Sequence, residues 1–330
     1  MLLDIDRHHD AVLTLADVLA ARRRLAPYLA PTALLRHPRL KPLVGTDVLV
    51  KHENHQPTGA FKVRGGINLV SQLTRDERDR GVIAASTGNH GQSVAYAAAL
   101  FGVRSVICVP EGANPVKVGS IRDCGAELVV HGRDFDEARE HGEHLAGERG
   151  YRYIHSGNEP LLIAGVATAT LEILEADPLI DVLIVPVGGG SGAASACIAG
   201  KAVKPSLEVI GVQAEAAPAA WRSWKARRLV EDRMETFAEG LATGTAFELP
   251  QRILWAMLDD FVLVSDDDMR QAMVLMLEAT RNLVEAAGAA PLAAAMRLRD
   301  RLAGRRVALV ASGGNVTLDQ LEAVLSRRPR

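Results

Sequence analysis

The sequence predicts an α/β protein in which helices cover parallel sheets. Short apolar runs that are rich in β-branched residues and bounded by Gly, Pro or charge are typical of buried strands. They occur at residues 47–51, 82–85, 105–109, 128–130, 182–187, 209–212 and 307–311. Stretches with apolar residues three and four apart lie between them, at residues 92–101, 135–149, 163–175, 269–279 and 290–302. This alternation of strand and helix patterns indicates parallel sheets with helical connections.

The length of the chain predicts two domains. A chain of 330 residues exceeds what one hydrophobic core usually supports. The stretch from about Thr74 to Tyr153 forms a compact series of strand and helix patterns of its own. We therefore expect a small domain at residues 75–153 and a large, discontinuous domain made of residues 1–74 and 154–330.

The composition disfavours several classes of function. The chain is 48% hydrophobic and 24% charged with a formal net charge of −2, which gives no electrostatic reason to bind nucleic acid or a membrane surface. Cys108, Cys124 and Cys197 form no CxxC pair, which predicts reduced thiols in a cytoplasmic protein. Residues 1–24 begin with acidic and histidine residues and continue as an amphipathic helix. They lack the basic and apolar segments of a signal peptide, and we expect no membrane span.

Lys62 is the first candidate for chemistry. It lies in the stretch Pro57–Gly66, after a glycine turn and at the start of a helical pattern, where an amine is well placed to capture an aldehyde. A lysine that forms a Schiff base needs a fixed approach path and a partly dry pocket. Since solvated lysines on helix surfaces are far commoner, the choice depends on partners elsewhere in the chain.

The glycine-rich run Val185–Gly192 predicts an anion site. It follows a strand and opens the helical pattern from Ala193, so backbone N–H groups can surround an anion at the helix N-terminus. The dinucleotide fingerprint G-x-G-x-x-G is not met, and the next acidic residues are only Glu208 and Glu215. Lys62 also lacks the spacing of a nucleoside-triphosphate loop. A compact phosphate on another cofactor fits better, and a plain turn after a strand is the structural alternative.

Two further loops follow predicted strands. The loop Ala85–Gln92 gathers hydroxyl, amide and backbone donors at a helix N-terminus, which suits a carboxylate. The same side chains can instead simply cap the helix. The loop Val310–Asn315 places Ser312 before two glycines, where its hydroxyl meets a planar ring or only forms a turn. The segment Trp221–Gly244 has weak periodicity and is either a mobile loop over a site or a surface excursion.

Taken together and in this order, the motifs resemble one known family. The chain is similar to the fold-type II pyridoxal-phosphate enzymes, and within them to the threonine/serine dehydratase and serine racemase group, from about Leu15 to Leu321. The matching pieces are Thr58–Gly66, Ser86–Gln92, Val185–Gly192, Val284–Ala289 and Ser312–Val316. The resemblance implies a tryptophan synthase β-like fold, with two open parallel-sheet domains and helices on both faces.

The resemblance also implies how the cofactor is held. Lys62 would bind pyridoxal 5'-phosphate as a Schiff base, Phe61 would flank its ring, and Asn89 would hydrogen-bond its 3-hydroxyl. The phosphate would be held by Gly188, Gly189, Gly190, Ser191 and Gly192. Ser312 would face the pyridine nitrogen and leave it largely unprotonated, which suits elimination over transamination. Glu285 would support the cofactor pocket from an adjacent helix.

The implied reaction is the dehydrating deamination of a hydroxyamino acid such as L-threonine or L-serine. The substrate carboxylate would be received by the loop residues Ser86, Thr87, Gly88, Asn89 and His90. Glu239 and Gly240 occupy the place of a loop that lies near the substrate in this family. Lys62 would act first as tether and then as the base that removes the α-proton. Loss of the β-hydroxyl then leads to a 2-oxo acid and ammonia, which makes the chain a lyase.

Some residues depart from the family pattern. Thr87 stands where the racemases place a serine that protonates the opposite face of the substrate, so it is a second catalytic candidate. Ser191 replaces a usual glycine and adds a hydroxyl donor to the phosphate loop. Gln213 and Ala219 stand where the racemase-like members have the carboxylates of a divalent-cation site. Glu215 can stand in for them but is more typical of a surface acid, and we expect no metal ligands.

Several alternatives stay open at the level of sequence. One is an amino-acid racemase similar to serine racemase. Another is a dehydratase of a hydroxyectoine-derived hydroxyamino acid, because the lead-in His52–Pro57 and the loop Phe237–Thr243 resemble those catabolic enzymes. A third is a noncatalytic binding protein that keeps the pyridoxal-phosphate fold. The group usually forms homodimers. Because the chain stops soon after its last motif, we do not expect the regulatory domain that biosynthetic threonine deaminases carry.

Overall fold

The computed structural model describes residues 13–327, and these residues form two β-sheets. The large sheet has the strand order β1-β2-β10-β7-β8-β9 and the small sheet has the order β5-β4-β3-β6. All strand pairs are parallel except β1, which runs antiparallel to β2. The strands are β1 (Leu34–Arg36), β2 (Val48–His52), β3 (Val82–Ala85), β4 (Ser105–Val109), β5 (Glu127–Val130), β6 (Arg152–Tyr153), β7 (Val182–Pro186), β8 (Glu208–Ala214), β9 (Asp260–Val264) and β10 (Val307–Ala311).

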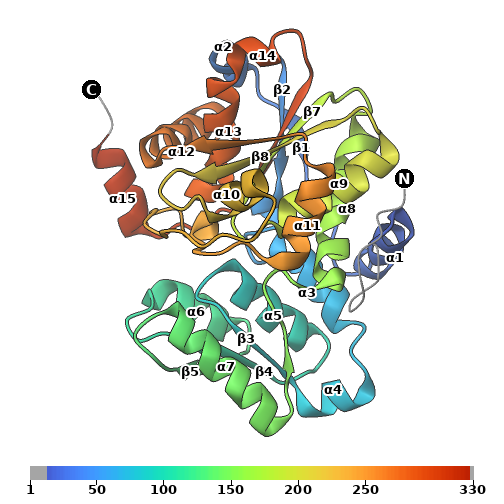
Figure 1. The fold of residues 1–330 in the computed structure, drawn as a ribbon, viewed down its shortest axis with the longest axis vertical. Coiled ribbons are helices and arrows are strands. Elements are labelled where there is room, and N and C mark those ends of the chain that lie inside the picture. The colour runs from blue at the N-terminus through green and yellow to red at the C-terminus, as the bar shows by residue number, and fades with distance from the viewer. Residues whose placement is uncertain (1–12, 328–330) are drawn as a thin grey trace.

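Helices connect the strands and divide between the two sheets (Figure 1). Those of the large sheet are α1 (Leu15–Leu25), α2 (Lys41–Val44), α8 (Pro160–Ala176), α9 (Ser191–Val203), α10 (Ala219–Ala226), α11 (Glu248–Met257), α12 (Asp266–Thr280), α13 (Ala286–Arg297), α14 (Arg299–Leu302) and α15 (Leu318–Ser326). Around the small sheet lie α4 (Arg75–Arg80), α5 (Asn89–Leu100), α6 (Pro115–Asp123) and α7 (Phe135–Arg149). Helix α3 (Lys62–Val70) lies between the two groups, and short 3-10 turns occur at η1 (Pro38–Leu40), η2 (Glu53–His55) and η3 (Glu239–Leu241).

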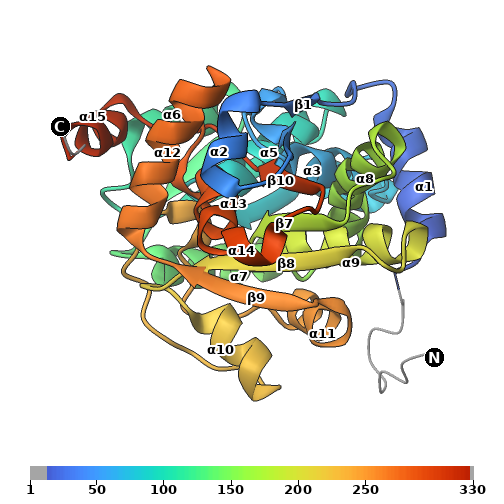
Figure 2. The same cartoon turned by 90° about the horizontal axis from the view of Figure 1, so that it is seen from above.

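The large sheet is buried on both faces because successive strand residues point to opposite sides. Val182 and Ile184 of β7 pack in one core with α12 and α13, whereas Leu183 and Val185 pack in another with α8 and α9. Figure 2 shows these two pairs of helices on opposite sides of the sheet. The continuous apolar sequence of β7 is thus the direct consequence of helices on both faces.

Helix α3 packs between α5, which lies beside the small sheet, and α8, which covers the large one. Its residues Val63 and Ile67 belong to the core that contains Val94 of α5 and Ile107 of β4. All four strands of the small sheet lie between Val82 and Tyr153. We propose that residues 75–153 form the small domain and that α3 is the element through which it rests on the large domain, residues 1–74 and 154–330.

Bare glycines let the neighbouring helices approach α3 closely. A Cβ on Gly65 would lie 2.9 Å from the carbonyl oxygen of Leu162 in α8. A Cβ on Gly66 would lie 2.4 Å from the hydroxyl of Ser93 in α5. A side chain at either position would therefore push α3 away from one helix and into the other.

The α/β class predicted from the sequence is confirmed, and the differences concern short or unpatterned elements. The strands β1, β6 and β9 were not predicted, because β1 and β6 are too short for a pattern and β9 carries an acid at its start. The helix expected at 290–302 begins earlier, at Ala286, and is interrupted before Arg299. Its first turns were missed because they are buried all round and show no polar face.

The remaining features of the fold are the two ends of the chain and the irregular segment 221–244. The first half of the helix pattern expected at residues 1–24 lies outside the described residues, and α1 accounts for the remainder. The segment 221–244 contains the end of α10 and, in its second half, η3. Within residues 13–327, no helix is both long and apolar enough to cross a membrane.

Candidate active site

Lys62 is the first residue of α3 and its amine is held by uncharged partners. Lys62 Nζ donates to the carbonyl oxygen of Ser156 at 2.7 Å and to Ser191 Oγ at 2.9 Å. The amine lies 5.4 Å from the centre of the Phe61 ring. Burial lowers the pKa of Lys62 to about 8. A useful fraction of the amine is therefore neutral near pH 7, as attack on an aldehyde requires.

Ser312 and the lysine loop share a cavity. Phe61, Gly192 and Ser312 line a cavity of about 380 Å³, and the backbone N–H of Phe61 donates to the Ser312 carbonyl at 2.9 Å. Glu53 also lines this cavity, but Arg64 donates to both of its carboxylate oxygens, at 2.7 and 2.8 Å. Ser312 and Thr170 are the other polar side chains that line this cavity, and both carry a hydroxyl.

The glycine loop places unpaired donors beside Lys62. It follows β7, and Gly190 adopts a left-handed conformation with φ of +92° just before α9 begins at Ser191. Within the described chain, no hydrogen bond uses the backbone N–H of Gly188, Gly189 or Gly190. Free N–H groups at a helix N-terminus suit a dianionic phosphate. The added hydroxyl of Ser191, expected to be a donor, accepts a hydrogen bond from Lys62.

The loop between β3 and α5 has a partly structural role. Ser86 Oγ accepts a hydrogen bond from the backbone N–H of Gly88 at 3.2 Å, whereas the capping of α5 by a side chain of this loop is not seen among the described residues, because its N-cap residue is Gly88. Thr87 lies between them and is half-buried. His90 is buried, and its Nε2 lies 3.0 Å from the carbonyl oxygen of Ile154. Burial lowers the pKa of His90 to about 3, so its ring is neutral.

Asn89 connects this loop to two others. Its Nδ2 donates to Glu285 Oε1 at 2.7 Å, and its Oδ1 accepts from Asn315 Nδ2 at 2.7 Å. Glu285 is the N-cap residue of α13, and burial raises its pKa to about 7. The repulsion of Glu239 acts in the same direction. Asn315 was only a motif position in the sequence, and nothing local to it indicated this contact.

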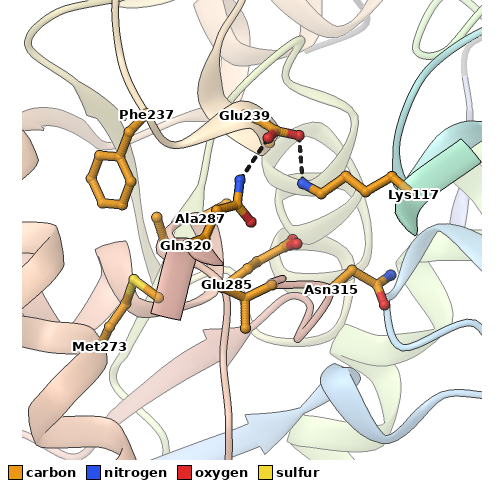
Figure 3. A pocket seen from close by; sticks show the side chains of 11 residues that line it. Lys117, Phe237, Glu239, Met273, Glu285, Ala287, Asn315 and Gln320 are labelled. Carbon is orange, nitrogen blue, oxygen red and sulfur yellow. Dashed lines mark hydrogen bonds and ion pairs between the residues drawn. The ribbon is translucent and has the colours of Figure 1, made fainter. Parts of the chain in front are cut away.

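A second cavity opens beside Glu285 (Figure 3). It has about 310 Å³ of empty space and is lined by Glu239, Gly240 and Glu285 among others. Lys117 of α6 forms an ion pair with Glu239, Nζ to Oε2 at 2.5 Å, and Gln320 Nε2 donates to Glu239 Oε1 at 2.7 Å. The pair joins α6, which lies beside the small sheet, to η3. Sequence reasoning missed Lys117, because a single lysine in a helix carries no signal of a distant partner.

A buried charge cluster, defined as Lys51, Glu53, Arg64 and Glu172, lies beneath the lysine loop. Besides its bonds to Glu53, Arg64 donates to both oxygens of Glu172, at 2.6 and 2.8 Å. Lys51 Nζ contacts Glu172 Oε2 at 2.5 Å. Because Arg64 belongs to the same helical turn as Lys62, this cluster anchors the first turn of α3. No sequence motif predicted it.

The positions compared with a divalent-cation site hold neutral groups. Gln213 is buried, and its Oε1 accepts from the backbone N–H of Trp221 at 2.9 Å. Ala219 begins α10, and Glu215 pairs with Arg297 at 3.0 Å on the surface. Within residues 13–327, no group of three or more His, Cys, Asp or Glu side chains could hold a metal ion.

Comparison with known proteins agrees with this geometry. The family model described as pyridoxal-phosphate dependent enzyme matches residues 25–313. An L-threonine ammonia-lyase of Thermotoga maritima is 36% identical over 319 residues, which cover 96% of this chain and 79% of that protein. Among solved structures, the processed form of threonine deaminase isoform 2 from Solanum lycopersicum is 30% identical with a TM-score of 0.90, covering 94% of this chain and 91% of the other.

A racemase is similar to nearly the same degree. The serine racemase of Dictyostelium discoideum is 33% identical with a TM-score of 0.87, covering 93% of this chain and 100% of the other. The two solved structures therefore share one fold and one arrangement of strands with this chain. One of them is named a threonine deaminase and the other a serine racemase, so the fold alone does not distinguish the two activities.

Proposed function

The chain belongs to the family of pyridoxal-phosphate-dependent enzymes, and on this premise we propose that it is a lyase that removes water and ammonia from a hydroxyamino acid. The substrate class is that of L-threonine and L-serine, and the products are a 2-oxo acid and ammonia. The relatives named threonine ammonia-lyase and threonine deaminase support this class. The observation that carries the proposal is a buried amine of lowered pKa beside a helix N-terminus with free N–H groups.

The residues present fit pyridoxal 5'-phosphate. The unpaired N–H groups of Gly188 to Gly190 would hold the phosphate, together with Ser191 and Gly192. Phe61 and Ser312 would contact the ring, and Asn89 would bond its 3-hydroxyl. When bound, the cofactor supplies an electrophilic aldehyde carbon and an electron sink that acidifies the substrate α-proton.

The protein side chains then have separate tasks. Lys62 is tether first and base second, and its uncharged surroundings favour the neutral amine that both tasks need. The N-terminus of α5, with the hydroxyls of Ser86 and Thr87, binds the substrate carboxylate through N–H groups. Glu239 and Gly240 border the substrate side chain at the cavity. The neutral hydroxyl of Ser312 at the ring nitrogen favours elimination.

The proposal is tested with the purified protein and added pyridoxal phosphate. We expect absorbance of a lysine-bound cofactor and release of 2-oxo acid and ammonia from a panel of hydroxyamino acids. Lys62→Ala should abolish the product and the lysine-bound absorbance while leaving the fold intact by circular dichroism. A parent protein that stays colourless with excess cofactor contradicts the proposal. The panel also decides whether a hydroxyectoine-derived hydroxyamino acid is preferred over L-threonine.

A racemase is the second candidate, and Thr87 is the observation that favours it. Its half-buried hydroxyl lies on the loop that carries Asn89, and the structural relatives include a serine racemase. Thr87→Ala should abolish exchange between L- and D-serine while the kcat of elimination stays within about twofold and its KM rises, because the Thr87 hydroxyl also contacts the substrate carboxylate. Absence of exchange in the parent protein excludes this activity.

We also propose a cytoplasmic homodimer without a nucleic-acid or membrane partner. The support is that Cys108, Cys124 and Cys197 are free, and that burial raises the pKa of each thiol. Such thiols are typical of a reducing compartment. Gel filtration with light scattering tests the dimer, and a monomer mass of 35.3 kDa would contradict it.

A further inference from the structure

Asn315 joins three loops of the candidate site. Its Nδ2 donates to the carbonyl oxygen of Thr58 at 2.8 Å and to Asn89 Oδ1 at 2.7 Å. The Nδ2 of Asn89 in turn donates to Glu285 Oε1 at 2.7 Å. A continuous row of hydrogen bonds thus runs from the lysine loop, through both amides, to the N-terminus of α13.

The direction of this row is imposed from its ends. The Thr58 carbonyl is only an acceptor, so Asn315 must turn its Nδ2 toward it. The second hydrogen of Asn315 Nδ2 is donated in a hydrogen bond to Asn89, which must therefore accept it with Oδ1. At the other end Glu285, in the ionised form that predominates above about pH 7, is also only an acceptor and needs the Nδ2 of Asn89. The amide of Asn89 consequently has one favourable orientation.

Close packing keeps Asn315 in place. Gly59 has a φ of +67°, and a Cβ there would lie 2.6 Å from Asn315 Oδ1. The backbone N–H of Gly314 also donates to the Gly59 carbonyl at 2.9 Å. The Asn315 side chain is therefore seated directly on the glycine turn that precedes Lys62.

We propose that Asn315 is a positioning residue that fixes the Asn89 amide with its N–H side toward the cofactor. One hydrogen of Asn89 Nδ2 binds Glu285, and in the described chain no hydrogen bond uses the other. That second hydrogen is the donor for the cofactor 3-hydroxyl oxygen. The inference rests on the proposed function, because that function gives Asn89 this partner.

Asn315→Asp is the direct test, because it keeps the shape and removes the donor. The introduced carboxylate would face the Thr58 carbonyl and draw the Nδ2 of Asn89 toward itself, which turns Oδ1 toward the cofactor. We expect the dissociation constant for pyridoxal phosphate, measured by fluorescence titration of the apoprotein, to rise at least about tenfold. Asn315→Ala removes the donor without reversing it, and the expected rise is about fivefold. This milder variant carries the test if the aspartate variant does not fold.

Asn282→Asp is the matched control. It makes the same amide-to-acid change in the loop before α13, where Asn282 Nδ2 also donates to a backbone carbonyl, that of Thr280, at 2.8 Å. Within residues 13–327, Asn282 makes no hydrogen bond to Asn89. The dissociation constant should stay within about twofold of the parent value.

A double variant separates orientation from simple stability. In Asn315→Asp with Glu285→Gln, the reversed Asn89 gains a donor at the α13 end, so the contact between residues 89 and 285 is satisfied again while the Thr58 carbonyl still faces an acceptor. The melting temperature of the apoprotein should recover part of its loss while the dissociation constant stays raised. Recovery of both together would overturn the positioning role. Equal affinity of parent and Asn315→Asp overturns this role alone, and a parent without affinity for the cofactor overturns the proposed function as well.

Discussion

The buried charge cluster and the charges around the second cavity differ in how they are balanced. In the buried charge cluster two cations face two carboxylates, and Glu53 is completely buried. Around the cavity one cation, Lys117, faces the carboxylates of Glu239 and Glu285, and the Glu239 side chain is 46% exposed. We call these three residues the cavity charge cluster. The positive and negative charges of the buried charge cluster are equal in number. The cavity charge cluster has one more carboxylate than cations and is partly exposed to solvent.

The difference is visible in the two buried acids. Burial alone would raise the pKa of Glu53, yet Arg64 and Lys51 hold it below its usual range. Burial raises the pKa of Glu285 to about 7, and Asn89 and Lys117 counteract this only in part. The buried charge cluster therefore keeps its charges, whereas the charge of Glu285 depends on pH near neutrality.

The largest effect is expected from breaking the buried charge cluster. Arg64→Met leaves Glu53 and Glu172 without their main partner, and we expect a loss of about 3–5 kcal/mol in the free energy of unfolding. Urea denaturation measures it. Arg75→Met is the control, because the Arg75 side chain is 93% exposed and its removal should change stability by less than about 0.5 kcal/mol. Equal losses in the two variants would refute the anchoring role.

An intermediate effect is expected from the uncompensated acid. Because the pKa of Glu285 is raised from 4.5 to about 7, the folded protein keeps a proton that the unfolded chain loses. Its contribution is therefore fully present below about pH 4.5 and is lost as pH rises through about 7. The stability lost across this window should be about 3 kcal/mol larger in the parent than in Glu285→Gln. Denaturation midpoints measured between pH 4.5 and 8 check this, and parallel curves would contradict it.

The smallest effect on stability is expected at the cavity mouth. Lys117→Met removes a pair whose acid is half exposed, so the free energy of unfolding should change by less than about 1 kcal/mol. It leaves two carboxylates facing the substrate, and KM should rise about five- to tenfold. Steady-state kinetics separate KM from kcat. Lys41→Met, at a surface ion pair with Asp47, serves as control and should leave both constants unchanged.

The parts of the site that the sequence predicted were local ones. Lys62, Asn89 and Ser312 each follow a strand or glycine turn, and that local pattern marks a site at the carboxyl end of a parallel sheet. The anchors of those residues were not predictable in the same way. Arg64 lies 108 residues from Glu172, and Lys117 lies 122 residues from Glu239. Such pairs leave no periodic trace, because only the folded arrangement of separate elements brings them together.

The fold shows the same division. The apolar runs of β7 and β10 are long enough to mark buried strands, and they were predicted within one residue at each end. Strand β1 is three residues long and mostly exposed, and its pairing with β2, rather than a sequence pattern of its own, makes it a strand. Helix α13 was misplaced at its start because alanines and glycines buried on every side show no amphipathic face.

The close contacts of α3 restrict how this protein can be changed. Gly65 and Gly66 face α8 and α5, so moving α3 to relieve a new side chain at one position tightens the contact at the other. Substitutions that alter substrate choice are therefore best placed in the cavity walls around Glu239. The position of the Lys62 amine depends on the close contacts of Gly65 and Gly66, so it cannot be changed independently of them. In protein engineering, α3 is therefore the helix to leave unchanged while residues outside it are substituted.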